Sequence, residues 1–353
     1  MLNNPTITLC VLAYNRPKDL ENTIRSFLWQ DYQNSELLII DDLGSSRIEE
    51  VTRKWMKKSK KITYYKNHKN LGVTTNIRNA FKISRSDVIV FMGDDDIFID
   101  NKALSLFAKA FADPNIGSAK ASQIVFKNGR VNQAYPLKRD KKQIIYYEKS
   151  DIFDKLWLES VSFTGLAFRN NEAIRKLISK SITLFPQVEL MGFVSLFYKS
   201  AEINNYLVGV QSYSKGQLNP VFYDINGIRT NILDDWFQIF ERIRQLANKK
   251  KKVFISFEVF REKSAHFYLL LLPYNTLTNG RTQTAVFILN IFKYNKKIIL
   301  VPFFWISLVV STVFPKAFII PCLEIAKTFR TKNQLNVKEI KKYNDVLKKY
   351  YLF

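Results

Sequence analysis

Three consecutive carboxylates, Asp94, Asp95 and Asp96, are the residues of this chain whose spacing points most directly to chemistry. They follow Val88 to Met92, a short, continuous apolar run typical of a strand buried in a covered parallel sheet. Ligands of open α/β sheets bind at this end of the strands, and neighbouring acids repel one another unless a cation lies among them. The pattern therefore predicts a hard divalent metal that carries a phosphorylated ligand. Taken alone, the same acids could begin a solvated helix.

The elements that must position these acids alternate as strand and helix at the spacing of βαβ units. Buried strands are expected near 7–13, 37–40, 62–65 and 88–92, and helices with one apolar face near 17–28, 46–58 and 73–83. Shorter strands follow between 116 and 147, then helices near 150–158, 171–179 and 188–199, and a strand at 205–211. The fold class is therefore α/β, a Rossmann-like, mostly parallel sheet flanked by helices.

A stretch that contains Gly, Asn and Pro, residues 216–227, is the best candidate for a domain boundary. We expect a catalytic domain over 1–215, a linker over 216–229 and a helical, basic region over 230–353. Most of the formal net charge of +23 lies in the last third, where residues 241–353 carry 21 Lys and Arg against 6 Asp and Glu. This surplus predicts an anionic partner, whether nucleic acid, a membrane surface or a phosphorylated substrate.

Four polar loops follow four of the expected strands: Ala13-Tyr14-Asn15-Arg16, Asp41-Asp42, residues 70–79 and Asp94-Asp95-Asp96. With their flanks they read TLCVLAYNRP, LLIIDDLGSS, NLGVTTNIRNA and VFMGDDDIF. In order and spacing these segments resemble family 2 glycosyltransferases of the GT-A fold, of the bacterial surface-polysaccharide type. The resemblance covers about residues 6–212. Each motif alone is weak, whereas four in the same order are specific.

The resemblance implies a nucleotide-sugar site and assigns seven residues to nucleotide binding: Ala13, Tyr14, Arg16, Asp42, Asn70, Arg78 and Asp94. Tyr14 would stack on the base, and Asp42 would accept a hydrogen bond from it. Arg78 would lie near the base or the diphosphate. In isolation, Asp42 could belong to an ordinary strand-end turn and Arg78 to a helix surface.

The metal-binding D-x-D of the family falls on Gly93-Asp94-Asp95 when the following Ile-Phe is aligned. The first acid is therefore missing, and the resemblance implies Asp95 as the main metal ligand, with Asp96 sharing the role. Mg²⁺ or Mn²⁺ suits carboxylate and phosphate oxygens. Either ion would neutralise charge on the departing nucleoside diphosphate.

Transfer to a hydroxyl also needs a general base, which the family places at the start of a late helix. In the segment Phe185 to Met191 the base position falls on Gln187, with Glu189 two residues later. We nominate Glu189 as the base, although a plain helix-surface Glu is an equal alternative. If Gln187 replaces the base, another acid must act.

An uncharged stretch, residues 298–315, would form a helix about 27 Å long, marginal for a hydrocarbon core of ~30 Å. Lysines lie on both sides of it, which favours both ends remaining cytoplasmic. We expect an interfacial or re-entrant element over 298–325; the alternative is a core helix pair of a soluble domain. Residues 338–351 form a second pattern, an apolar stripe opposed by lysines, typical of a helix on an anionic bilayer.

Other sequence features narrow the choice of cellular compartment and of reaction class. Cys10 and Cys322 are the only cysteines and favour a reducing cytoplasm. The first residues lack a basic segment and a long apolar one, so we expect no secretory signal. A Gly-rich nucleotide loop of the G-x-G-x-x-G or Walker type is absent from the sequence, which argues against hydride transfer and ATP hydrolysis.

The patterns, read with the resemblance, imply a metal-dependent glycosyltransferase, inverting, that moves a sugar from a nucleotide-sugar donor to a lipid-linked or surface polysaccharide acceptor. It would lie peripherally on the inner, cytoplasmic face of the cell membrane, against the anionic membrane surface and not on nucleic acid. One rival is a sugar nucleotidyltransferase, which would want a Gly-rich phosphate loop near the N-terminus. The other is a non-catalytic basic scaffold that binds membrane or RNA, which leaves the four aligned loops unexplained.

Overall fold

A computed structural model of the chain describes residues 4–135, 143–148, 151–152, 156–181, 183–212, 232–250, 272–273, 276–277, 280–289, 291–292, 296–315, 317–319, 321 and 335–351. Its contacts define two compact units. The first comprises Met1–Leu218 together with Asn333–Phe353, and the second comprises Asn219–Lys332. The linker expected at 216–229 lies outside the described residues.

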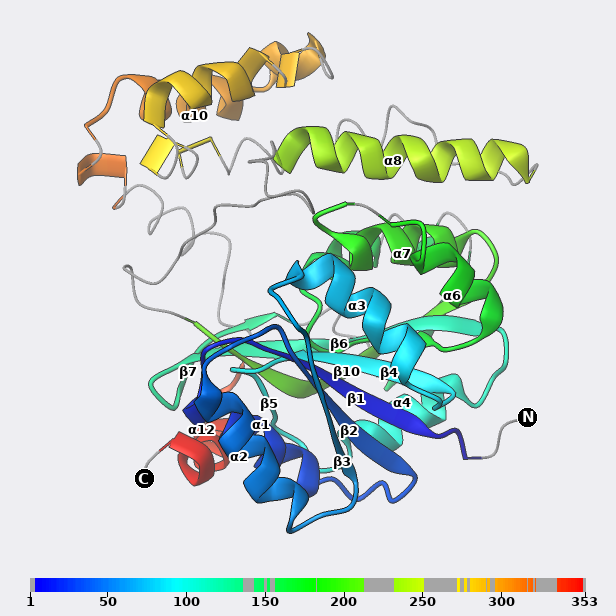
Figure 1. Cartoon of the computed structure of the whole chain (residues 1–353). Helices are drawn as coiled ribbons and strands as arrows, with labels where there is room; N and C mark the ends of the chain where they lie inside the picture. The colour runs from blue at the N-terminus through cyan, green and yellow to red at the C-terminus, as the bar shows by residue number, and fades with distance from the viewer. Residues whose placement is uncertain are drawn as a thin grey trace. The chain divides into compact units, whose positions relative to one another are not determined.

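The first unit is built on one mixed sheet of ten described strands (Figure 1). They are β1 (Ile7–Ala13), β2 (Ser35–Asp41), β3 (Ile62–Lys66), β4 (Val88–Gly93), β5 (Ile97–Phe98), β6 (Ile116–Lys127), β7 (Arg130–Tyr135), β8 (Ile144–Tyr147), β9 (Leu166–Arg169) and β10 (Lys199–Gln211). The order is β3-β2-β1-β4-β9-β6-β10-β5, with β7 paired to β6 and β8 to β10. Strands β3, β2, β1 and β4 are parallel, as predicted, and β9 runs antiparallel to β4 and β6.

Helices cover both faces of this sheet, which confirms the predicted α/β class. The described ones in this unit are α1 (Pro17–Leu28), α2 (Ser46–Met56), α3 (Gly72–Ile83), α4 (Ala103–Phe111), α6 (Glu172–Ile178), α7 (Pro186–Ser195) and α12 (Val337–Tyr351), with the 3-10 helix η1 at Trp157–Val161. Figure 1 shows α3, α6 and α7 on one face and α1 and α2 on the other.

Continuous apolar runs in the sequence account for this core. Strands β1 and β4 are buried almost throughout, as their continuous apolar runs predict. The rings of Phe81, Phe91 and Phe168 pack in one cluster in tilted and edge-on arrangements, with centroids 5.9–6.4 Å apart. They tie α3 to β4 and β9, so the helix after the third strand is fixed against the strand that carries the acids.

Two predicted elements differ from the structure. The helix expected at 150–158 lies partly outside the described residues, and its described end forms η1. The helix expected to reach Lys199 ends at Ser195, and β10 begins at Lys199. Pairing of β10 with β6 and β8 supplies the reason, because these tertiary hydrogen bonds outweigh the local helical pattern.

The C-terminal helix α12 forms as predicted but packs on the first unit. Its Tyr343, Leu347 and Tyr350 are buried in one cluster with Ile97 and Phe126 of β5 and β6. The sequence pattern predicted that this apolar stripe would contact a bilayer. In the structure it packs against the protein's own sheet. Helix α12 belongs with the first unit and not, as predicted, with the rest of region 230–353.

The second unit contains α8 (Ile232–Lys249), the 3-10 helix η2 (Lys296–Leu300) and α10 (Pro302–Thr312). The uncharged stretch 298–315 thus divides between a short 3-10 turn and a helix of 11 residues. Among the described residues, we find no helix with both the length and the apolar character needed to cross a bilayer.

Candidate active site

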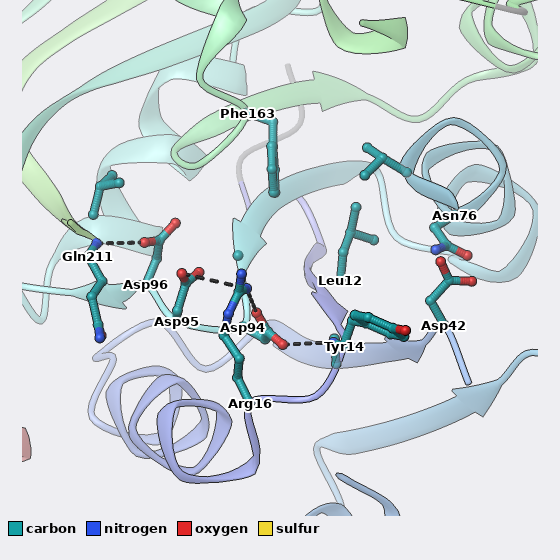
Figure 2. A pocket seen from close by; sticks show the side chains of 14 residues that line it. Leu12, Tyr14, Arg16, Asp42, Asn76, Asp94, Asp95, Asp96, Phe163 and Gln211 are labelled. Atoms are coloured by element: carbon teal, nitrogen blue, oxygen red, sulfur yellow. Dashed lines mark hydrogen bonds and ion pairs between the residues drawn. The ribbon is translucent and has the colours of Figure 1, made fainter. Parts of the chain in front are cut away.

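A cavity of about 340 Å³ opens at the carboxyl ends of β1, β2 and β4 (Figure 2). It is lined by Leu12, Ala13, Tyr14, Arg16, Asp42, Val73, Asn76, Gly93, Asp94, Asp95, Asp96, Phe163, Val210 and Gln211. In Figure 2 the three consecutive acids lie on one side and Tyr14, Asp42 and Asn76 on the other, with Leu12 between them. The loops after the first, second and fourth strands therefore meet, as parallel strand order requires.

Asp94 joins the end of β4 to the end of β1. Its Oδ2 accepts a hydrogen bond from the Tyr14 backbone N–H at 2.7 Å, and its Oδ1 accepts one from Nη1 of Arg16 at 2.7 Å. Burial raises the pKa of Asp94, while the Tyr14 N–H and the Arg16 guanidinium oppose that rise. Asp94 thus fixes the loop that carries Tyr14 and positions Arg16.

Asp95 points into the cavity beside the same arginine. Its Oδ2 lies 3.6 Å from Nη1 of Arg16, too far for a hydrogen bond but close enough for an ion pair. Burial and the neighbouring Asp96 raise the pKa of Asp95 well above its usual range. A cation that entered here would relieve both effects.

Asp96 is held on both oxygens. Oδ1 accepts the Gln211 backbone N–H at 2.9 Å, and Oδ2 accepts the Thr164 hydroxyl. Burial raises the pKa of Asp96 to about 6 despite these two hydrogen bonds. Through these two hydrogen bonds, the Asp96 carboxylate connects β10 and the segment before β9 to the loop that contains Asp94, Asp95 and Asp96.

Gly93 is the residue that the resemblance aligns with the first acid of D-x-D. A Cβ at this position would lie 2.7 Å from Oδ1 of Asp95 and 2.9 Å from Oδ2 of Asp96. Both carboxylates fold back over the glycine, so a larger residue would displace them. The acids of this chain occupy the space that a side chain at position 93 would need.

The opposite side of the cavity carries an aromatic ring next to a carboxylate. The Tyr14 ring is 47% exposed and lies beside Asp42 in Figure 2. Asp42 accepts hydrogen bonds from Asn67 Nδ2 at 2.8 Å and from the backbone N–H groups of Leu71 and Gly72 at 2.7 and 2.9 Å. These contacts make Asp42 the anchor of the loop before α3 as well as a residue of the cavity wall.

Two residues assigned to the nucleotide do not line this cavity. Asn70 is exposed, and its Oδ1 accepts a hydrogen bond from the Gly72 N–H at 3.2 Å. Arg78 is half-buried on α3, and its Nε is buried without a hydrogen-bond partner in the described part of the chain. Both positions lie outside the cavity lining, where Asn76 occurs instead.

Glu189 is not brought to the cavity. It lies in α7, a helix whose residues are all buried, and its Oε2 accepts a hydrogen bond from the Thr183 hydroxyl at 3.3 Å. Gln187, which the resemblance aligns with the base position, donates from Nε2 to the carbonyl of Val161 at 3.1 Å. The structure therefore does not support Glu189 as a base in contact with an acceptor, because its carboxyl faces the interior of the helical layer.

Sequence reasoning did not identify Asn76, Phe163, Val210 and Gln211. Asn76 lies one helical turn after Gly72, on the face of α3 towards the cavity, and that spacing was the available signal. Phe163 precedes β9, and Val210 and Gln211 end β10. These residues reach the cavity only through sheet pairing over a long sequence separation, which leaves no local pattern.

The donor set fits a divalent metal only with help from a ligand. In the described part of the chain, no three His, Cys, Asp or Glu residues are arranged to hold an ion by themselves. Mg²⁺ and Mn²⁺ bind one or two carboxylates together with substrate phosphates and water. Asp95 meets that requirement, whereas Asp96 already accepts two hydrogen bonds. The residues present therefore fit a metal that arrives with a diphosphate.

Comparisons with known proteins agree with this geometry. The model of the family described as glycosyl transferase family 2 matches residues 8–178. The chain is 26% identical over 145 residues to protein MT1568 of Mycobacterium tuberculosis, covering 39% of this chain and 44% of that protein. It is 26% identical over 183 residues to the GalNAc(5)-diNAcBac-PP-undecaprenol beta-1,3-glucosyltransferase of Campylobacter jejuni, covering 48% and 58%. The alignments thus span less than two thirds of either relative.

A solved structure shares the fold. Residues 1–349 of S. aureus TarS superpose with a TM-score of 0.57 at 14% identity, covering 98% of this chain and 91% of that one. At this identity the likeness concerns the fold alone. It extends the GT-A-like architecture beyond the segment that the family model matches.

Proposed function

We propose that the chain transfers a sugar from a nucleotide-sugar donor to an acceptor hydroxyl, in keeping with the match of residues 8–178 to the model of glycosyl transferase family 2. The observation that carries the proposal is the meeting of Arg16, the Tyr14 ring and Asp95 in one cavity at the carboxyl ends of β1 and β4. A cation-binding carboxylate, a guanidinium and an exposed aromatic ring are the three groups that a nucleoside diphosphate needs.

The donor would lie across the cavity with its base on the side of Tyr14. Stacking on the ring and contact with Asn76 and Asp42 would hold the base, and the diphosphate would reach Arg16 and Asp95. The Gln211 Oε1 atom is buried and has no hydrogen-bond partner in the described chain. A buried hydrogen-bond acceptor without a partner costs free energy. A hydroxyl group on the sugar of the bound nucleotide sugar would be suited to donate a hydrogen bond to this oxygen.

Asp95 would hold Mg²⁺ or Mn²⁺ through its carboxylate. The bound ion supplies positive charge that stabilises the departing diphosphate. Arg16 contributes a second positive charge on the same side. Asp94, which accepts hydrogen bonds from Tyr14 and Arg16, keeps both in place.

In the reaction, the acceptor oxygen forms a bond to the anomeric carbon while the bond from that carbon to the diphosphate oxygen breaks. Attack from the face opposite the diphosphate inverts the configuration. The diphosphate leaves with the bonding electrons, and the acceptor hydroxyl proton passes to a base. The buried position of Glu189 argues against that residue, and Gln187 cannot act as a base.

We propose an acceptor saccharide on a lipid carrier, in surface polysaccharide synthesis at the cytoplasmic face of the membrane. The name of the Campylobacter jejuni relative describes a substrate linked to undecaprenol through a diphosphate. The basic surplus of residues 241–353 supports a location at an anionic surface.

The product that is released distinguishes a glycosyltransferase from a sugar nucleotidyltransferase and from a non-catalytic scaffold. The full chain is incubated with UDP-, GDP-, dTDP- and CMP-sugars and Mn²⁺, and the freed nucleotide is measured. We expect slow hydrolysis of the nucleotide sugars of one nucleotide class. The rate of this hydrolysis should be at least a hundredfold lower in Asp95→Ala. Formation of pyrophosphate from a nucleoside triphosphate and a sugar phosphate would instead identify a nucleotidyltransferase. A chain that releases neither product would refute both enzyme functions.

A further inference from the structure

Helix α10 has its polar and apolar faces reversed. Its buried residues are Phe304, Ser307 and Ser311, at the spacing of one helix face. The exposed side chains next to them include Trp305 at 51% and Ile306 at 59%. On a helix that faces water, the serines would be outside and the large apolar side chains inside.

The hydroxyl of Ser311 finds its partner within the helix. Ser311 Oγ donates to the backbone carbonyl of Ser307 at 2.6 Å, within the helix itself. Phe304 packs against Phe292 with ring centroids 5.2 Å apart, so this face has a defined contact in the second unit. The helix is therefore anchored by its small and aromatic side, and its outward apolar side is left available.

The outward side forms a continuous surface, which we call the α10 patch. It consists of Leu300, Phe303, Trp305, Ile306, Val309 and Val313, which are between 39% and 76% exposed. Contiguous apolar surface of this kind marks a contact site for a membrane or another protein.

Charge distinguishes between these occupants. Lys296 and Lys297 are exposed in η2, immediately before the patch. Residues 219–332 as a whole carry 17 Lys and Arg against 7 Asp and Glu. In a symmetric contact between two copies, the α10 patch of one copy would face the α10 patch of the other. The positive charges near the two patches would then face and repel one another. An anionic bilayer offers the complementary charge, and tryptophan is favoured at its interface.

We propose that the α10 patch binds the surface of an anionic lipid bilayer, with α10 lying in the plane of the interface. Eleven residues of helix span about 16 Å, too short for a hydrocarbon core of ~30 Å, which excludes α10 alone as a span. The inference deepens the proposed function by naming the surface that meets the membrane, and it rests on different residues from the active site.

Co-sedimentation of the full chain with phosphatidylglycerol vesicles tests the proposal, with phosphatidylcholine vesicles in parallel. We expect binding to the anionic vesicles, weakened by salt, and at least a tenfold lower partition coefficient for Ile306→Ser/Val313→Ser. Val337→Ser is the matched control, because Val337 is 82% exposed on α12 of the other unit. In a second readout, brominated lipid should quench the fluorescence of the wild type more than that of Trp305→Phe.

Calorimetric nucleotide binding by the same preparations separates the two proposals. Equal vesicle binding by wild type and the double variant, or no vesicle binding by a chain that still binds nucleotide, would overturn the α10 inference alone. Sedimentation velocity that showed a dimer abolished by the double variant would assign the patch to a second copy and also overturn it. Vesicle binding without nucleotide binding would instead count against the transferase.

Discussion

Nη1 of Arg16 lies 2.7 Å from Oδ1 of Asp94, and this ion pair connects the loops after β1 and β4. The side chain of Asp94 is almost fully buried, whereas that of Arg16 is 43% exposed towards the cavity. Arg16 is therefore held from behind and remains accessible to an anionic ligand. This arrangement directs the guanidinium of Arg16 at the place where a nucleoside diphosphate would bind.

Arg16→Ala should weaken binding of a nucleoside diphosphate by about tenfold to a hundredfold, because hydrogen bonds to charged groups contribute about 1.5–3 kcal/mol. Calorimetric titration measures the change. Arg53→Ala is the control, since Arg53 pairs with Glu49 on the surface of α2. Equal effects of the two variants would mean that Arg16 acts only through overall charge.

Tyr14→Ala should weaken nucleotide binding, whereas Tyr14→Phe should preserve it, because stacking needs the ring and not the hydroxyl. Stacking of a base on an aromatic side chain contributes about 1–3 kcal/mol, or roughly fivefold to a hundredfold in affinity. Tyr65→Ala serves as the control, since this ring is 40% exposed on β3. A loss in Tyr14→Phe as large as in Tyr14→Ala would contradict stacking.

Gly93→Ala should lower metal-dependent nucleotide binding with little effect on the rest of the fold. The added Cβ would lie 2.7 Å from Oδ1 of Asp95, so the carboxylate must move. We expect a larger loss of affinity with Mn²⁺ present than without it. The circular dichroism spectrum should remain that of the wild type. Unchanged affinity with Mn²⁺ would show that the position of Asp95 is not critical.

Lys120 gives a prediction about pH. It is 2% exposed, and its Nζ donates to the carbonyls of Ser162 and Thr164 at 2.6 and 2.7 Å. Burial lowers the pKa of Lys120 to about 7, against the opposing attraction of Glu159 and Asp96. The ordinary value of about 10.4 applies to the unfolded chain. Between these values the unfolded chain binds more protons, so this residue makes the free energy of unfolding rise with pH.

Lys120→Met removes that titration. Urea unfolding at pH 7 and pH 9 should show a larger gain in stability at the higher pH for the wild type than for the variant. The comparison cancels other groups that titrate in both chains. Parallel changes in the two proteins would mean that Lys120 keeps an ordinary pKa in the folded state.

Local patterns in the sequence were sufficient to place the first four strands and to bring the loops after β1, β2 and β4 to one cavity. The acids of β4 and the Tyr14 and Asp42 loops could be placed together because parallel strands bring their carboxyl ends to one edge. The metal role of Asp95 and the nucleotide roles remain predictions. The hydrogen bonds of Asp96 to Thr164 and Gln211 could not be foreseen, because they connect residues brought together by β9 and β10.

Helices were harder to orient than to find. In α7 every residue is buried, so the sequence has no apolar stripe that shows where Glu189 points. In α12 the stripe of Tyr343, Leu347 and Tyr350 was visible, but an amphipathic pattern is the same whether it meets a bilayer or a sheet. The reversal of α10 appears only when burial of Ser307 and exposure of Trp305 are known.

The most direct test of the central claim is calorimetric binding of UDP, GDP, dTDP and CMP to the full chain, with and without Mn²⁺. We predict tight binding of one of them that needs Mn²⁺ and is lost in Asp95→Ala. It should be kept in Asp345→Ala, a control on the exposed surface of α12. Absence of binding for all four nucleotides with Mn²⁺, or equal binding by Asp95→Ala and the wild type, would contradict the proposed nucleotide-sugar site.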